Sequence, residues 1–251
     1  MFGVYNLSDL YEPGKVQLVP EEIFIHDDWR PDDENYDADI ALLQFGDEIA
    51  FTRYIQPICL WNEDEEPTQT LGFVAGWGQS QDLLKDFEEI PTQIEVSIYD
   101  SNENCFYKDK DLVDLSSNRT FCGGRGDGTG ICFGDSGSGL SIWVNGFSYL
   151  RGIVSSGLVT QTSCDVIAPA VYTNVLKYKT WIQEKDCVDK KGLACDQNGR
   201  SGLKKFNTNI HLILRFCFLL QKKLPRRAQI FRIMKLWNKV TKKLFMKNSR
   251  T

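Results

Sequence analysis

The chain has 251 residues, of which 42% are hydrophobic, and a formal net charge of −5 at pH 7. This length can bury one sizeable core or two small ones, and with an acidic overall balance we expect no nucleic-acid partner. The average conceals a split, since residues 1–187 hold 12 Lys and Arg against 32 Asp and Glu, whereas residues 188–251 hold 17 against 2. We therefore divide the chain into a folded domain, residues 1–187, and a basic tail, residues 188–251, that is not a domain.

Residues 1–187 contain short runs of β-branched and aromatic residues bounded by Gly, Pro, Asn and Asp, and this pattern predicts strands. The runs are, in chain order, Val16–Val19, Ile40–Phe45, Gly72–Trp77, Ile94–Ile98, Gly139–Val144 and Leu150–Val154. The best helical pattern follows at Val175–Lys185, where apolar residues recur every three or four positions. The sequence thus predicts an all-β domain closed by one C-terminal helix.

The basic tail has a different pattern. Residues 229–245 place apolar side chains on one helical face among lysines and arginines, which is typical of a helix that lies on a membrane surface. The apolar stretch Leu212–Leu220 is interrupted by Arg215 and is too short to span a bilayer, which needs about 20 residues. The abrupt charge reversal and the loss of the strand pattern favour an alternative, in which the tail is an extension without selected function.

The eight cysteines favour an oxidising compartment, because they do not form the CxxC pairs of zinc sites. Sequons for N-glycosylation at Asn6 and Asn118 agree with secretion. No basic segment followed by an apolar run stands at the N-terminus, so a signal peptide is not visible and we expect the secreted protein to begin upstream. We expect neither a metal nor another cofactor.

The segment Ile131–Gly139, ICFGDSGSG, places Ser136 beside an acidic residue among glycines. A serine nucleophile needs a neighbouring base, usually an imidazole held by a carboxylate, and the chain has only two histidines, His26 and His211. A carboxylate candidate, Asp39, begins the apolar run DADIALLQF, where its burial would be costly without a partner. Other motifs follow in order: QPICL at 56–60, AGWG at 75–78, GIVSSG at 152–157 and PAVYTNV at 169–175.

Together these motifs resemble those of chymotrypsin-type serine endopeptidases over about residues 3–185. The resemblance implies a chymotrypsin-like double β-barrel with an incomplete first barrel, a C-terminal helix, and proteolysis of protein or peptide substrates through an acyl-enzyme. Asp39 would orient the base and Ser136 would attack the scissile carbonyl. The backbone N–H groups of Gly134 and Ser136 would form the oxyanion hole. Asp135 would pair with the N-terminal amine that cleavage of the zymogen releases.

The resemblance also implies a specificity pocket and two disulfides. The pocket residues are Gly130 at the floor, with Ser155, Gly157 and Ala170. No carboxylate is available at Gly130 to bind Lys or Arg, and the methyl group of Ala170 narrows one wall, so we expect cleavage after small or medium apolar residues. The disulfides are Cys105–Cys122 and Cys132–Cys164, and the partners of Cys59, Cys187, Cys195 and Cys217 stay open.

The base is the part of this pattern that does not carry over. In the family the histidine lies some forty-odd residues before the aspartate, and that position falls ahead of Met1 here. The activation sequence and the usual partner of Cys59 would also lie ahead of Met1. His26 is too near Asp39 in sequence to be that histidine, and we expect it to be a solvated loop residue. We therefore expect an N-terminally truncated peptidase that is inactive as it stands. The alternative is a non-catalytic homologue that acts as a binding or regulatory module.

Two other triad orders fit the sequence less well. A subtilisin-type order needs a histidine between aspartate and serine, and residues 40–135 contain none. An α/β-hydrolase order of Ser136, Asp165 and His211 is formally possible, but the second glycine of the G-x-S-x-G motif is replaced by Ser138 and a strand follows where a helix is needed.

Overall fold

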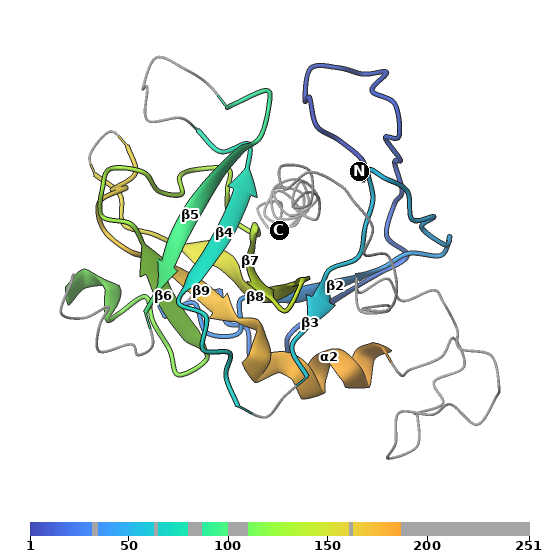
Figure 1. Ribbon diagram of the computed structural model, residues 1–251. Helices are drawn as coiled ribbons and strands as arrows, with labels where there is room; N and C mark the ends of the chain where they lie inside the picture. Colours follow the sequence, from blue (N-terminus) through green and yellow to red (C-terminus); the bar gives the residue numbers. More distant parts are fainter. Residues whose placement is uncertain (32–34, 63–64, 80–86, 100–109, 161–162, 187–251) are drawn as a thin grey trace, which may run out of the picture.

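The computed structural model describes residues 1–31, 35–62, 65–79, 87–99, 110–160 and 163–186 (Figure 1). The predicted basic tail, residues 188–251, lies outside the described residues, and so do His211 and Cys105. None of the helices in the described ranges has both the length and the apolar run that crossing a bilayer requires.

Six strands between residues 71 and 174 form a closed antiparallel barrel (Figure 1). They are β4 (Leu71–Gly76), β5 (Thr92–Ile98), β6 (Thr120–Gly124), β7 (Gly139–Val144), β8 (Phe147–Ser156) and β9 (Ala170–Asn174). Their order is β8-β7-β4-β5-β6-β9, and β9 pairs back with β8, which closes the sheet and leaves these six strands without a free edge. The predicted all-β fold with a C-terminal helix is confirmed.

The barrel interior is filled by apolar side chains from all six strands. They are Val74, Val96, Ile98, Phe121, Leu140, Ile142, Val154, Ala170 and Tyr172. Strands β7 and β8 are joined by Asn145 and Gly146, with φ angles of 48° and 88°. Two consecutive residues with positive φ are what a tight two-residue hairpin needs, and Asn-Gly is the sequence that adopts them most readily.

The N-terminal part of the chain packs against this barrel. Strands β1 (Glu22–Ile25) and β2 (Ala41–Gln44) form a two-stranded antiparallel sheet, and β3 (Cys59–Leu60) pairs parallel with β8. The strand predicted at Val16–Val19 is wrong: within the described residues Val16 makes one antiparallel bridge, to Phe2. The extended partner ends there because Gly3 has a φ of +74°, and Pro20, which follows the run, has no N–H to donate.

The C-terminal helix joins the two parts. It begins as the 3-10 turn η2 (Val175–Tyr178), capped by Asn174, and continues as α2 (Lys179–Asp186). Its buried face, which includes Tyr178 and Ile182, packs on the segment that leads into β2. This contact places residues 38–42 beside the barrel, and Asp39 lies within them.

Candidate active site

The segment that carries Ser136 forms a tight turn ahead of β7. The N–H of Asp135 donates to the carbonyl of Cys132 at 3.0 Å, and the N–H of Ser138 donates to the carbonyl of Asp135 at 2.9 Å. Ser138 is fully buried, whereas Ser136 is partly exposed. The turn therefore holds Ser138 inside the protein and leaves Ser136 partly exposed to solvent.

Strand β8 fixes this turn to the barrel. The N–H of Gly137 donates to the carbonyl of Val154 at 2.8 Å, and the N–H of Val154 donates to the carbonyl of Ser138 at 2.7 Å. Gly137 has a φ of +83°, a conformation that favours glycine. The backbone directly after Ser136 is thereby tied to the C-terminal part of β8.

The backbone N–H groups of Gly134 and Ser136 lie beside the hydroxyl. Among the residues that the structure describes, neither N–H has a hydrogen-bond acceptor. Gly134 has a φ of +95°, and a Cβ at this position would lie 2.6 Å from the ring of Phe87. Two free N–H groups next to a hydroxyl can stabilise the oxyanion that forms when the hydroxyl attacks an acyl carbon.

The Asp135 carboxylate is buried against the AGWG segment, residues 75–78. It accepts hydrogen bonds from the N–H of Gly78 at 2.9 Å and from the N–H of Cys132 at 3.0 Å. Burial raises the pKa of Asp135, and these two hydrogen bonds offset only part of that effect. In the described part of the chain no cationic side chain pairs with it. Asp135 is thus a buried carboxylate whose negative charge a cation could neutralise.

Both glycines of AGWG are explained by Asp135. A Cβ at Gly76 would lie 2.0 Å from Oδ1 of Asp135, and a Cβ at Gly78 would lie 2.2 Å from Oδ2. No side chain fits at either position unless the carboxylate moves. The spacing of this motif is therefore set by the acidic residue that lies 57 positions after Gly78.

Asp39 lies just ahead of β2 and is partly buried. The hydroxyl of Ser155 donates to its Oδ2 at 2.7 Å, and the hydroxyl of Thr173 donates to its backbone carbonyl at 2.9 Å. Burial raises the pKa of Asp39, and the Ser155 hydrogen bond partly opposes this rise. Strand β8 thus supplies a partner for the carboxylate of Asp39, and β9 supplies one for its backbone carbonyl.

Strand β8 brings Asp39 and the Ser136 turn together. Ser155 bonds to Asp39, and its neighbour Val154 holds Gly137 and Ser138, the two residues that follow Ser136. The two residues that the motifs nominate are therefore linked through adjacent positions of one strand. Ser155, expected in the specificity pocket, has its hydroxyl on Asp39 instead.

His26 does not lie where the sequence predicted. Its side chain is only 12% exposed, and its ring packs against Tyr178 and Trp181, with centroids 5.2 and 4.9 Å apart. Nδ1 accepts a hydrogen bond from the N–H of Asp28 at 3.2 Å. The expectation of a solvated histidine is wrong because the C-terminal helix covers this ring. Its contacts are with that helix and with its own loop, not with Asp39 or Ser136.

A small cavity lies at the end of the barrel beside the Ser136 turn. Gly130, Gly157 and Ala170 line it, together with Ile131 and Val166. A Cβ at Gly130 would lie 3.0 Å from Cβ of Val166. The cavity volume is about 20 Å³. A single water molecule needs roughly 10–15 Å³. The cavity is therefore narrow, and its lining combines apolar side chains with polar ones that include Glu95 and Asp165.

Disulfides hold this region together. The predicted bond between Cys132 and Cys164 is present, with the two Cα atoms 5.4 Å apart. Cys122 is also disulfide-bonded, but its predicted partner Cys105 lies outside the described residues, so that pairing stays a prediction. Cys59, whose partner the sequence left open, is disulfide-bonded as well.

Comparison with known proteins decides the family. A family profile described as Trypsin matches residues 3–182, which is well over half of the chain. The chain belongs to the trypsin family. Similar curated proteins include Serine protease gd of Drosophila melanogaster, 30% identical over 214 residues, which are 72% of this chain and 40% of the relative. Serine protease ea of Drosophila melanogaster is 32% identical over 180 residues (68% and 44%), and human Testisin is 32% identical over 158 residues (60% and 48%).

This trypsin-family chain spans less than half the length of these relatives, so the activity of the whole protein is a matter for proposal.

The pocket residues Ile131 and Val166 were missed by sequence reasoning. Ile131 directly follows Gly130 and could have been found from that position, whereas Val166 reaches the cavity through a loop that no sequence pattern predicts.

Proposed function

We propose that this chain is part of a secreted serine endopeptidase, in which Ser136 is the nucleophile. The observation that carries the proposal is the pair of free N–H groups, of Gly134 and Ser136, beside a partly exposed hydroxyl on a turn fixed to β8. A structural turn gains nothing from two unsatisfied N–H groups. A site that must receive an oxyanion requires them.

The proposed reaction is acyl transfer. Oγ of Ser136 attacks the carbonyl carbon of the scissile peptide, its proton passes to a histidine base, and the carbonyl oxygen becomes an oxyanion held by the N–H groups of Gly134 and Ser136. The C–N bond then breaks, and the base returns the proton to the departing amine. Water repeats the sequence on the acyl-enzyme. Asp39 orients the base, which is supplied by a histidine other than His26.

The environment of Asp135 supports activation by cleavage of a zymogen. Its buried carboxylate already accepts hydrogen bonds from the N–H groups of Gly78 and Cys132. Burial nevertheless raises the pKa of Asp135, because it makes the charged form of the carboxylate unfavourable. A cationic N-terminal amine, released by cleavage, would neutralise it. That pairing would fix the adjacent Gly134–Ser136 segment in the conformation that leaves both N–H groups free.

The cavity supports a preference for small apolar side chains before the cleaved bond. Gly130 offers no carboxylate, and Ile131, Val166 and Ala170 narrow the space beside it. An arginine side chain would find no carboxylate at the floor position Gly130, and burial of its charge without a partner there is strongly unfavourable. We expect cleavage after residues such as alanine, valine or leucine, with the smallest preferred.

The test compares three proteins with a fluorophosphonate probe and a peptide library. The whole protein encoded by the transcript, after activation, is expected to label at Ser136 and to cleave after small apolar residues. Its Ser136→Ala variant controls for labelling elsewhere. The 251-residue chain is expected neither to label nor to hydrolyse peptide esters, because His26 is held by the helix and cannot serve Ser136.

One observation favours a second candidate, a non-catalytic homologue that binds or regulates: in the described part of the chain no histidine contacts Asp39. Absence of labelling in the activated whole protein would support that module and refute the peptidase. Cleavage after Lys or Arg would keep the peptidase and refute the pocket assignment.

A further inference from the structure

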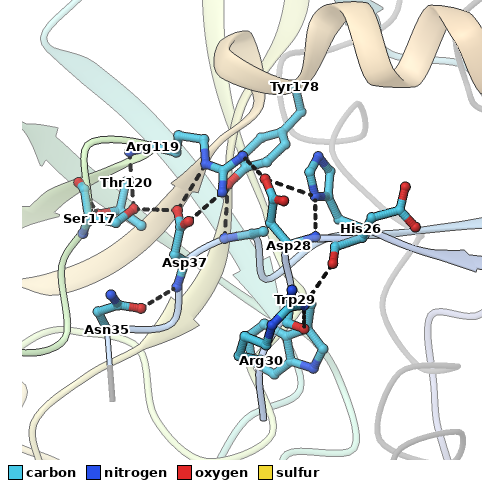
Figure 2. Close-up of polar contacts among 12 residues, drawn as sticks. His26, Asp28, Trp29, Arg30, Asn35, Asp37, Ser117, Arg119, Thr120 and Tyr178 are labelled. Atoms are coloured by element: carbon cyan, nitrogen blue, oxygen red, sulfur yellow. Dashed lines mark hydrogen bonds and ion pairs between the residues drawn. The ribbon is translucent and has the colours of Figure 1, made fainter. Parts of the chain in front are cut away.

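A charged cluster forms around Asp37, two residues before Asp39 in the chain. Figure 2 shows the guanidinium of Arg119 between two carboxylates. Its Nε donates to Oδ1 of Asp37 at 3.0 Å, a second nitrogen donates to Oδ2 of Asp37, and the third donates to Oδ2 of Asp28 at 2.7 Å. Ser117 adds a hydrogen bond to Asp37 at 2.8 Å. All the nitrogens of Arg119 are used, and Asp37 is held by both oxygens.

This cluster joins parts of the chain that are far apart in sequence. Asp37 and Asp28 belong to the loop between β1 and β2, whereas Arg119 directly precedes β6 and lies 82 positions after Asp37. The guanidinium of Arg119 also lies 5.3 Å from the ring centroid of Tyr178, on the C-terminal helix. Three segments that are distant in sequence therefore meet around Asp37, which lies two residues before Asp39.

The charges of the cluster are permanent near neutral pH. The hydrogen bond with Asp37 raises the pKa of Arg119 above its usual value, and the hydrogen bond from Arg119 lowers the pKa of Asp37. Both side chains are about three-quarters removed from solvent, with exposed fractions of 25% and 26%. A two-pronged arginine–carboxylate pair at this depth has more geometric restraint than an exposed pair.

The backbone beside Asp37 needs such restraint. Tyr36 and Ala38 have φ angles of 44° and 57°, in the left-handed region that non-glycine residues adopt at a cost of about 1–3 kcal/mol each. Ala38 is fully buried, and its N–H donates to the hydroxyl of Tyr178 at 3.0 Å. Without these contacts the strained backbone would relax toward ordinary angles.

This strained segment determines where Asp39 points. The N–H of Ile40 donates to the carbonyl of Ala38 at 2.7 Å, so the chain turns tightly with Asp39 at the centre. A change in the Ala38 backbone angles would change the direction in which the Asp39 side chain leaves the backbone. The cluster and the tyrosine hydroxyl thus act on the residue immediately before the carboxylate.

We propose that Arg119 and Tyr178 are positioning residues, which hold the Asp37–Ala38 backbone in its strained conformation and thereby aim the carboxylate of Asp39 into the candidate active site. For catalysis this inference rests on the proposed peptidase function. Its structural part concerns the orientation of Asp39 and does not require that function.

The first experiment follows the Asp39 carboxyl by ¹³C NMR in the 251-residue chain labelled at aspartate, with Asp39→Asn to assign the signal. Arg119→Gln removes the cluster, Arg119→Lys keeps the charge but loses the two-pronged contact, and Tyr178→Phe removes only the hydroxyl that Ala38 uses. The matched control is Arg53→Gln, because the Arg53 guanidinium also lies over a tyrosine ring, that of Tyr54, at 4.5 Å. We expect the pKa of Asp39 to fall toward its ordinary value of 3.8 in the first three variants and not in the control.

The second experiment measures peptide hydrolysis by the activated whole protein. Misplacing a catalytic group by about 1 Å can cost on the order of 100-fold in rate, so we expect kcat to fall by about 10- to 100-fold with KM unchanged. Arg119→Lys should recover less than the full rate, because a lysine cannot bond both oxygens of Asp37.

The outcomes separate this proposal from the proposed function. If the whole protein is inactive, the peptidase proposal fails, and the NMR experiment still decides the role of Arg119 and Tyr178. An unchanged Asp39 pKa in folded Arg119→Gln would overturn the proposal, even with lower stability, because it would show a merely structural role. Should Arg119→Gln not fold, the Asp39 pKa in Arg119→Lys and Tyr178→Phe decides the question by the same criterion.

Discussion

Replacement of Gly78 by alanine tests the coupling between the AGWG segment and Asp135. The added Cβ would lie 2.2 Å from Oδ2 and 2.3 Å from Cγ of Asp135, so the carboxylate must leave its position. It then loses hydrogen bonds from Gly78 and Cys132, each worth about 1.5–3 kcal/mol when the acceptor is charged. Rehydration of the carboxylate returns part of this, and we expect the free energy of unfolding to fall by about 2–4 kcal/mol.

The assay is urea unfolding of the 251-residue chain, followed by tryptophan fluorescence. The matched control is Gly157→Ala, where the nearest atom to the new Cβ is Cβ of Ala170 at 3.8 Å, an ordinary contact. A tolerated glycine-to-alanine change stabilises by about 0.4–1 kcal/mol through the unfolded state. In Asp135→Ala the clash is gone, so adding Gly78→Ala should cost almost nothing. Equal urea midpoints for Gly78→Ala and Gly157→Ala would refute the reasoning, as would full additivity of the Gly78 and Asp135 changes.

The pH dependence gives an independent check on Asp135. Because its pKa is raised in the folded protein, the native state keeps the proton to higher pH than the unfolded state does. The resulting stability is present below the ordinary value of 3.8 and is lost as the pH rises through the raised pKa. Asp135→Ala should remove this part of the slope of unfolding free energy against pH. An unchanged slope would show that Asp135 is exposed to water.

Three further predictions concern other parts of the domain. Asp39→Asn keeps the acceptor for the Ser155 hydroxyl and removes a carboxylate whose pKa is raised by burial. It should therefore stabilise the chain at pH 7 and not below pH 3.8, as measured by urea unfolding at both pH values. A less stable variant at pH 7 would contradict this. Cys132→Ala opens a disulfide that spans 32 positions and should cost about 3–4 kcal/mol in the chain-entropy model, with no further loss in the double variant with Cys164→Ala; additive losses would argue against the bond. Leu140→Ala, in the barrel core, should lower the unfolding free energy by about 2–5 kcal/mol, and a change below 1 kcal/mol would mean that the core repacks around it.

The sequence predicted the parts of the fold that depend on local pattern. Gly139–Val144 was predicted as a strand and forms β7 with the same bounds, because apolar and small residues bounded by glycine and Asn145-Gly146 mark it clearly. β6 was missed because two of its five residues are glycine, which is unfavourable in strands on its own. Its formation depends on pairing with β5 and β9, and such pairing cannot be read from a short segment.

The candidate site shows the same division. Motifs identified Asp39 and Ser136 because their immediate neighbours in sequence are characteristic. The Ser155 hydrogen bond to Asp39 joins residues 116 positions apart, and the ring of His26 is covered by a helix more than 150 positions later. Contacts of this kind depend on the closed barrel and on the helix that docks onto it, so no local pattern could have indicated them.

The way in which the barrel closes has a consequence for synthesis of the protein. Strand β9 is the last to leave the ribosome, yet it lies between β6 and β8 and supplies Thr173, which bonds to the backbone of Asp39. Until residues 170–174 emerge, β6 and β8 have no partner on that side, and Asp39 lacks one of its anchors. The nascent chain must therefore wait with exposed strand edges, which are prone to aggregation. The candidate site can therefore be completed only after residues 170–174 have been translated.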